Sequence, residues 1–180
     1  MKKTIYSLLM MVGVLVAFTS CEKEEIGNTA GVETAGEWHI TVAAIDASGE
    51  LLDADVFGDG AYNIQTCNTA ANVSNKMFIV DQVCYYFPYQ VEVDVDPVNL
   101  TFQVSNGENL YGEGEYGGET VSITGGKIVK NGTKTPSGMP ADYIEFYVSF
   151  SDDLVLAQYL PEGTRYKVSG FRYTGFVEDE

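Results

Sequence analysis

Apolar and polar residues alternate with a period of two along much of the chain. In the run 89–96, apolar side chains stand at positions 89, 91, 93 and 95, and polar ones, among them Glu92, Asp94 and Asp96, stand between them. Because successive side chains of a β-strand point to opposite faces of the sheet, this run predicts a half-buried strand whose outer face is acidic. A solvated acidic face of this kind also discourages edge pairing and aggregation.

The alternation returns in 100–105, where Leu100, Phe102 and Val104 share one face, and the intervening Asp-Pro-Val-Asn at 96–99 is typical of a turn. The two runs predict an antiparallel hairpin. Similar runs predict further strands at 38–45, 61–67, 76–81, 119–124, 127–130, 142–150 and 166–176, with Gly125-Gly126 as a turn.

No segment after residue 35 has a helical apolar period over three turns, although a short helical turn is allowed at 152–160. Residues 131–140, with two prolines and two glycines, predict a mobile loop. The pattern therefore predicts an all-β domain of about 8–10 antiparallel strands, either a barrel or a sandwich.

The first 20 residues differ from this pattern. Lys2 and Lys3 precede an apolar run from Ile5 to Phe18 that is too short to span a bilayer, which is typical of a secretory signal. Thr19 and Ser20 then precede Cys21, and small residues before a cysteine resemble the lipobox of bacterial lipoproteins. We therefore expect residues 1–20 to be a lipoprotein signal peptide and Cys21 to be the lipid attachment site.

Residues 21–35 are rich in small and polar residues and predict a flexible tether between the lipid and a single globular domain at 36–180. The acidic start of this tether, Glu22 to Glu25, resembles the export tags of some outer-membrane lipoproteins that reach the cell surface. A purely solvated spacer explains the same residues equally well.

Charge narrows the possible functions. The 180 residues carry a formal net charge of -16. Because nucleic acids are bound through basic surfaces, this charge argues against a nucleic-acid partner. It also implies repulsion from an anionic membrane surface, so that the lipid on Cys21 would have to hold the domain there.

Three stretches together resemble a bacterial lipoprotein family known as lipid-binding putative hydrolases. They are Gly36-Glu37-Trp38, the run from Tyr62 through Asn68-Thr69-Ala70-Ala71-Asn72 to Asp81, and the ending Val168 to Phe176. The resemblance implies a calycin-like, that is lipocalin-like, antiparallel β-barrel. In such barrels the tryptophan of the first strand closes one end and an arginine of the last strand covers its ring, so Trp38 and Arg172 are expected to be a structural pair.

Catalytic chemistry finds little support in the sequence. His39 is the one histidine, and its neighbours Trp38 and Ile40 predict that it faces outward if they face inward. The chain has no Gly-x-Ser-x-Gly nucleophile motif. Asp81 ends an apolar strand and is expected to be partly buried, with a structural role favoured over a catalytic one. We assign no catalytic residue, although the resembled family's description keeps a hydrolase open.

Metal and cofactor chemistry is also weakly indicated. Residues 53–58 begin like a calcium loop, but Phe57 and Ile64 stand where oxygen ligands are needed, so a polar turn is the better interpretation. No metal site and no cofactor are predicted. Cys67 and Cys84 are allowed by an exported location to form a disulfide, and two free thiols fit the sequence equally well.

The aromatic cluster Tyr85, Tyr86, Phe87 and Tyr89 is the positive signal for binding. Aromatic side chains at a barrel mouth can hold an acyl chain, stack on a sugar or contact a protein, and they can also simply pack the core. The sequence favours a lipid-anchored envelope protein whose barrel binds a lipid-like ligand. The alternative is a surface interaction protein with a filled barrel that contacts a protein or glycan, and a hydrolase is third. Oligomeric state is not predicted.

Overall fold

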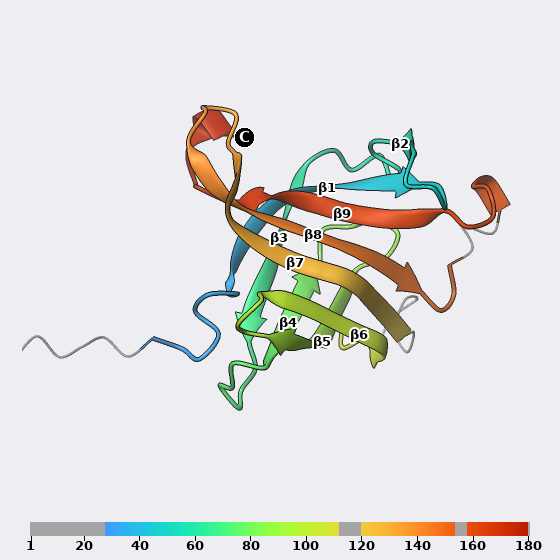
Figure 1. Ribbon diagram of the computed structural model, residues 1–180. Coiled ribbons are helices and arrows are strands. Elements are labelled where there is room, and N and C mark those ends of the chain that lie inside the picture. The colour runs from blue at the N-terminus through green and yellow to red at the C-terminus, as the bar shows by residue number, and fades with distance from the viewer. Residues whose placement is uncertain (1–27, 112–119, 154–157, 180) are drawn as a thin grey trace, which may run out of the picture.

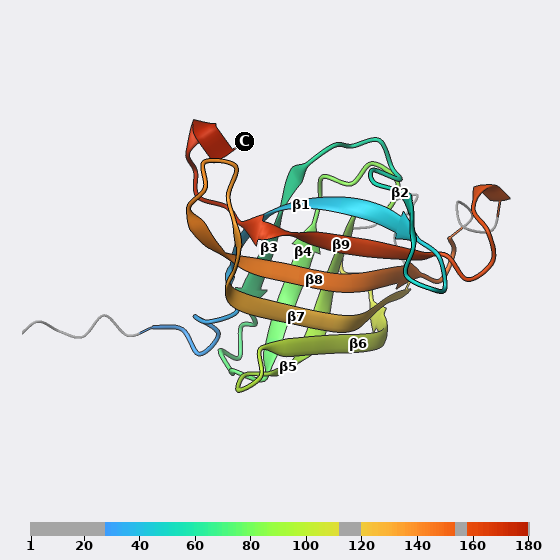
Figure 2. The same ribbon diagram turned by 45° about the horizontal axis from the view of Figure 1, so that its top comes forward.

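The computed structural model describes residues 28–111, 120–153 and 158–179. The strands of this part of the chain are β1 (Gly36–Ile45), β2 (Leu51–Asp53), β3 (Tyr62–Asn68), β4 (Lys76–Asp81), β5 (Tyr89–Asp96), β6 (Thr101–Glu108), β7 (Thr120–Lys134), β8 (Pro140–Phe150) and β9 (Arg165–Arg172), followed by a 3-10 turn, η1 (Val177–Asp179). All neighbouring strands are antiparallel. Because β9 pairs with β1, eight of them close into a barrel, as Figures 1 and 2 show.

The barrel confirms the predicted all-β class and the calycin-like architecture. The short β2 lies outside the closed ring and pairs only with the end of β1. The predicted hairpin is present as β5 and β6, in which Val95 lies opposite Phe102. At its turn, the Asp96 carboxylate accepts hydrogen bonds from the backbone amides of Val98 and Asn99. On the outer face of β5, Glu92 and Asp94 are exposed and pair with Lys76 of β4.

Two predictions in the β7 region are wrong. Residues 120–124 of the first predicted run belong to the same strand as the run 127–130, since Gly125 and Gly126 form a bulge between Thr124 and Lys127 instead of a hairpin turn. The positive φ of Gly125, 63°, suits such a bulge. The strand then continues through 131–134, so only residues 135–139 connect β7 to β8. The helical turn expected at 152–160 lies partly outside the described residues.

Inward-facing side chains of every barrel strand form a single apolar core. Its largest fully buried side chains are those of Trp38, Ile40, Ile64, Met77, Ile79, Tyr89, Val91, Val93, Ile123, Ile144, Phe146 and Tyr166. An eight-stranded barrel is just wide enough for side chains to fill its interior. The middle of this barrel is therefore packed with its own branched and aromatic residues.

The two ends of the barrel differ, and we name them by their residues. The tryptophan end contains the start of β1 with Trp38 and the end of β9 with Arg172, so both described termini leave the barrel there. The aromatic end contains the end of β8, the start of β9 and the connection from β4 to β5. Residues 30–35 of the predicted tether lie against the tryptophan end, where the Ala30 amide donates to Asn72 and Thr34 is buried.

Candidate functional site

Rings stacked against one another fill the aromatic end. The rings of Phe87 and Phe150 are stacked with centroids 4.5 Å apart, and those of Phe57 and Tyr166 lie 4.8 Å apart. Tyr89 meets Phe150 edge to face at 5.7 Å. Of the four aromatic residues predicted to bind a ligand, Phe87 and Tyr89 are thus buried in this packing.

The other two predicted residues, Tyr85 and Tyr86, lie on the surface with exposed fractions of 72% and 43%. Tyr86 borders a groove of about 280 Å³ at the aromatic end. Its walls are apolar except for one acid, and they consist of Asp53, Val56, Phe57, Tyr86, Tyr159 and Leu160. Because Tyr159 is 78% exposed, this groove displays aromatic surface to solvent.

Sequence reasoning missed most of this groove. Phe57 was noted only as a misfit in a calcium-like loop, and Tyr159 and Leu160 come from the distant connection between β8 and β9. The available signal was the presence of large apolar residues in connections that are otherwise polar. Their convergence depends on which connections the barrel brings to the same end.

Below the aromatic rings lies a buried polar cluster around Asp81, which is 3% exposed. Its carboxylate accepts hydrogen bonds from the Tyr62 hydroxyl at 2.9 Å and from the Cys84 amide at 3.0 Å. Burial raises the pKa of Asp81, against the opposing effect of these hydrogen bonds. The side chain thus joins β3 to the connection that carries the predicted aromatic cluster, which confirms the expected burial.

Cys67 and Cys84 are both free thiols. Cys67 is exposed near the end of β3 at the tryptophan end, and Cys84 is buried at the aromatic end. Burial raises the pKa of the Cys84 thiol to about 12, so this thiol stays protonated at neutral pH. The disulfide alternative left open by the sequence is not formed.

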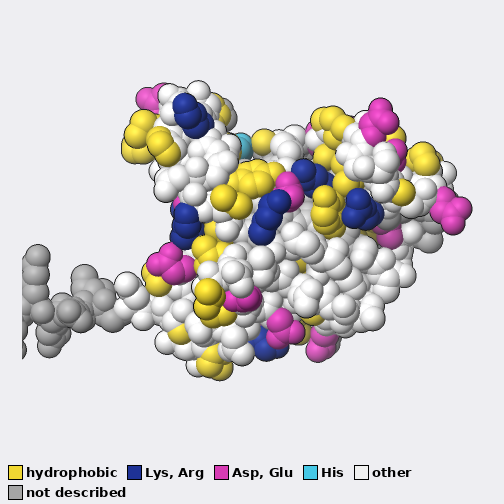
Figure 3. Space-filling model, in the orientation of Figure 1, with side chains coloured by type: hydrophobic (Ala, Val, Ile, Leu, Met, Phe, Trp, Pro, Cys, Tyr) yellow, Lys and Arg dark blue, Asp and Glu magenta, His cyan; other side chains and the backbone are white. Residues whose placement is uncertain are grey.

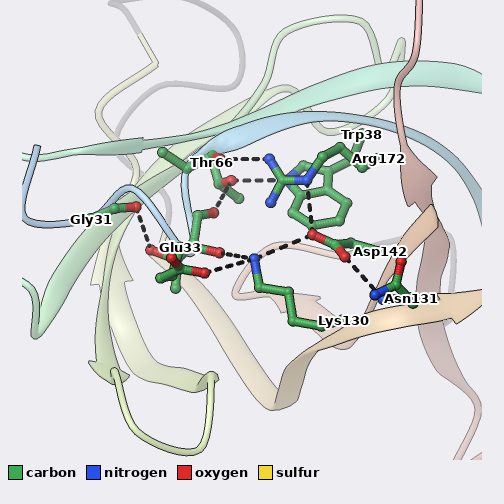
Figure 4. A network of polar contacts seen from close by, with 10 residues as sticks. Gly31, Glu33, Trp38, Thr66, Lys130, Asn131, Asp142 and Arg172 are labelled. Carbon is green, nitrogen blue, oxygen red and sulfur yellow. Dashed lines mark hydrogen bonds and ion pairs between the residues drawn. The ribbon is translucent and has the colours of Figure 1, made fainter. Parts of the chain in front are cut away.

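The tryptophan end has the predicted structural pair, shown in Figure 4. The guanidinium carbon of Arg172 lies 4.5 Å from the centroid of the Trp38 ring, and the Trp38 indole donates to Thr66 at 2.8 Å. Arg172 also donates to the Ala35 carbonyl at 2.7 Å. A Cβ at Gly36 would collide with this guanidinium, which explains why glycine precedes the tryptophan by two residues.

The side chain of His39 and the loop that begins like a calcium site both make contacts within the fold. The Nδ1 atom of His39 lies 2.7 Å from Oδ1 of Asn63, and its ring packs against Phe171. In the loop, Asp53 accepts the amide of Asp55, so its oxygen shapes a polar turn. Within the described residues, no cluster of three or more His, Cys, Asp or Glu side chains has a geometry suited to a metal ion.

Cys21 and the predicted signal and export residues lie outside the described part of the chain. Within the part that the structure describes, no helix has the length and apolar character required to cross a membrane.

These features define the class of the protein: a calycin-like antiparallel barrel with a packed interior, a tryptophan-arginine closure at one end and an apolar surface groove at the other. The chain belongs to the family described as lipid-binding putative hydrolase, whose sequence model matches residues 23–177. No curated protein matches the sequence.

Proposed function

We propose that this protein binds a small apolar or amphipathic, lipid-like ligand non-covalently in the groove at its aromatic end. The observation that carries the proposal is the exposed aromatic wall formed by Tyr86 and Tyr159 beside Phe57 and Leu160. The volume of the groove, about 280 Å³, is near the lower limit of small-molecule sites. An apolar wall with few polar groups is typical of such sites. Membership of a lipid-binding family supports a lipid-like ligand.

The groove suits an acyl chain better than the barrel interior does. In lipocalins, which are also eight-stranded barrels, the ligand occupies the interior. Here the inward side chains of β1, β5 and β8 meet in the middle, and the Phe87-Phe150 stack closes the aromatic end. A ligand at the surface requires no displacement of this packing.

The anchoring that we propose follows from the N-terminal sequence. Residues 1–20 would direct export, acylated Cys21 would hold the protein in the outer membrane, and Glu22 to Glu25 would favour display on the cell surface. Because β1 begins at the tryptophan end, an anchor on this side leaves the aromatic end facing away from the membrane.

A surface interaction protein is the second candidate, and the packed barrel interior favours it. The exposed Val83, Tyr85 and Tyr86 form an apolar patch beside the groove that could contact a protein or a glycan. A hydrolase is third, and one with a Ser-His or Cys-His nucleophile would have to use His39, whose Nδ1 atom contacts Asn63.

Native mass spectrometry of the full chain purified from its cells tests the ligand proposal. We expect co-purified lipid on the wild-type protein and its loss from the double variant Tyr86→Ser/Tyr159→Ser. The control is Val98→Ser, which removes an exposed apolar side chain at the other end of the barrel. Protein without lipid, or lipid retained equally by both variants, would contradict a ligand in this groove and favour the interaction protein.

A further inference from the structure

The basic residues of this acidic protein gather on one face. Among the described residues, all lysines and arginines except Lys76 lie on the last three strands: Lys127, Lys130 and Lys134 on β7 and Arg165, Lys167 and Arg172 on β9. In Figure 3, dark blue side chains lie over the region of β7, β8 and β9. In a chain with a formal charge of -16, this wall thus holds six of the seven basic residues that the structure describes.

A cleft of about 340 Å³ lies on this outer wall. It is bordered by β1, β8 and β9 and by the chain around β2, which we call the β2 segment (residues 46–57). Its polar floor comes from Thr41 of β1 and from Lys167 and Ser169 of β9, with Thr41 directly opposite Ser169 in the ladder. Ala43, Leu51 and Ala54 form its apolar side. The cleft therefore has one polar and one apolar half.

The β2 segment holds the apolar side of the cleft in place. The backbone amide of Val56 donates to the Val42 carbonyl at 3.1 Å, and Asp46 accepts the amides of Ser48 and Glu50 at the start of the segment. Leu51 is nevertheless 58% exposed. An apolar side chain held at the rim of a polar floor is suited to contact the tail of an amphiphile.

Lys167 is the one charged side chain among the residues that line the cleft. Glu145 is bonded to Lys167 at 2.8 Å and to Lys127 at 2.9 Å, so one carboxylate lies between two ammonium groups. Arg165 lies over the Tyr147 ring at 4.5 Å and adds a further positive charge. Burial acts to raise the pKa of Glu145, but the hydrogen bonds from Lys167, Tyr143 and Lys127 outweigh it and lower the pKa to about 2. The carboxylate is thus ionised at neutral pH and is shared by the two lysines.

We propose that this outer-wall cleft is a second binding site, for a single-chain amphipathic anion. The anionic head lies against Lys167 and the hydroxyls of Thr41 and Ser169, and the chain lies over Ala43, Leu51 and Ala54. The site is distinct from the aromatic-end groove, because the segment 51–57 separates them: Leu51 and Ala54 line the cleft, whereas Val56 and Phe57 line the groove.

Calorimetric titration of the full chain with dodecanoate tests this site. Dodecanoate carries the predicted head and tail, and dodecyltrimethylammonium, which has the same tail and the opposite charge, is the control ligand. We expect Lys167→Gln to weaken dodecanoate binding about tenfold and to leave the binding of the cationic probe unchanged. The matched variant is Lys76→Gln, which removes an ion-paired lysine from β4 and should leave both affinities unchanged.

A second variant and a spectroscopic readout locate the ligand. Leu51→Ser alters an exposed side chain, so the fold should be retained while dodecanoate binding weakens. In amide nuclear magnetic resonance spectra, dodecanoate should shift Thr41 and Ser169. Equal affinities for wild type, Lys167→Gln and Leu51→Ser, or shifts confined to residues 82–88 and 158–160, would overturn the outer-wall site. The second result would leave the aromatic-end groove supported, so the two proposals fail separately.

Discussion

Two tyrosines beside Asp81 differ in their hydrogen bonding. The Tyr62 hydroxyl donates to the Asp81 carboxylate, whereas the buried Tyr89 hydroxyl has no hydrogen-bond partner among the described residues. Burial raises the pKa of both phenols, with the Asp81 charge adding to the effect. For this single residue, the sequence predicted the burial of Asp81 from its place at the end of an apolar strand. It could not predict the tyrosine partner, which comes from a neighbouring strand.

Removing each hydroxyl in turn should therefore have unequal effects on stability. Tyr62→Phe removes the one side-chain hydroxyl that donates to the buried Asp81 carboxylate and leaves it with the backbone amides of Val83 and Cys84, so it should lower the free energy of unfolding by about 1–3 kcal/mol. Tyr89→Phe should change it by less than about 1 kcal/mol, because no hydrogen bond to a described residue is lost. Urea unfolding followed by Trp38 fluorescence measures both. Equal losses would show that the Tyr62-Asp81 bond contributes nothing specific.

At the scale of the strands, local alternation was sufficient to predict most elements. The bounds of β5 follow from a run in which apolar residues alternate with polar ones, those of β4 from a short apolar run between Lys76 and Asp81, and the hairpin after β5 from its turn sequence. Alternation was insufficient at Gly125-Gly126, because a glycine pair permits a bulge as well as a turn and the pairing with β8 decides between them. The exposed, three-residue β2 has too short a pattern to be recognised. The groove residues Phe57 and Tyr159 could not be paired from sequence, since barrel closure brings them together.

Closure also constrains β9 at Gly170, which lies opposite Ile40 of β1. A Cβ at this position would collide with the His39 carbonyl and come within 2.7 Å of the Ile40 Cα, both of them backbone atoms that cannot rotate away. We expect Gly170→Ala to lower the free energy of unfolding by about 2–3 kcal/mol.

The control for this substitution is Gly31→Ala, where the added Cβ would make an ordinary 3.4 Å contact with Asn68. It should change the free energy of unfolding by less than about 1 kcal/mol. Thermal unfolding of the two variants beside the wild type provides the comparison. Similar melting temperatures for both variants would mean that β1 and β9 are farther apart in solution.

For the whole molecule, the uneven distribution of charge matters more than the total. Composition alone predicted an acidic protein, and alternation correctly placed Glu92 and Asp94 on an outer face. Alternation did not reveal that most basic residues share another part of the barrel wall, on β7 and β9. That arrangement arises because β7, β8 and β9 are neighbours in the sheet and carry their charges on outward positions, where Glu145 bridges two strands.

Glu145 should therefore contribute to stability in a pH-dependent way. Its pKa of about 2 in the folded protein lies below the ordinary value of 4.5, so its contribution is complete above about pH 4.5 and is lost as the pH falls towards 2. Glu145→Gln should lower the free energy of unfolding by about 1–2 kcal/mol at pH 7, allowing for the partly exposed lysines. The difference from wild type should shrink between pH 4.5 and 2 in urea unfolding.

Glu92→Gln is the control, since Glu92 also pairs with a lysine but is well exposed. This substitution should cost less than about 0.5 kcal/mol at any of these pH values. A pH-independent loss in Glu145→Gln would assign the effect to packing instead of charge.

The pairing of β1 with β9 also determines when the domain can first fold. The seam joins residues 38–45 to residues 165–172, which are the first and last strands to leave the ribosome. Until the last strand has been synthesised, β1 lacks one of its two barrel neighbours and the core stays open on that side. With the export signal that we propose at its N-terminus, the chain would thus remain unclosed, and able to pass through a narrow translocation channel, for almost the whole time of its synthesis.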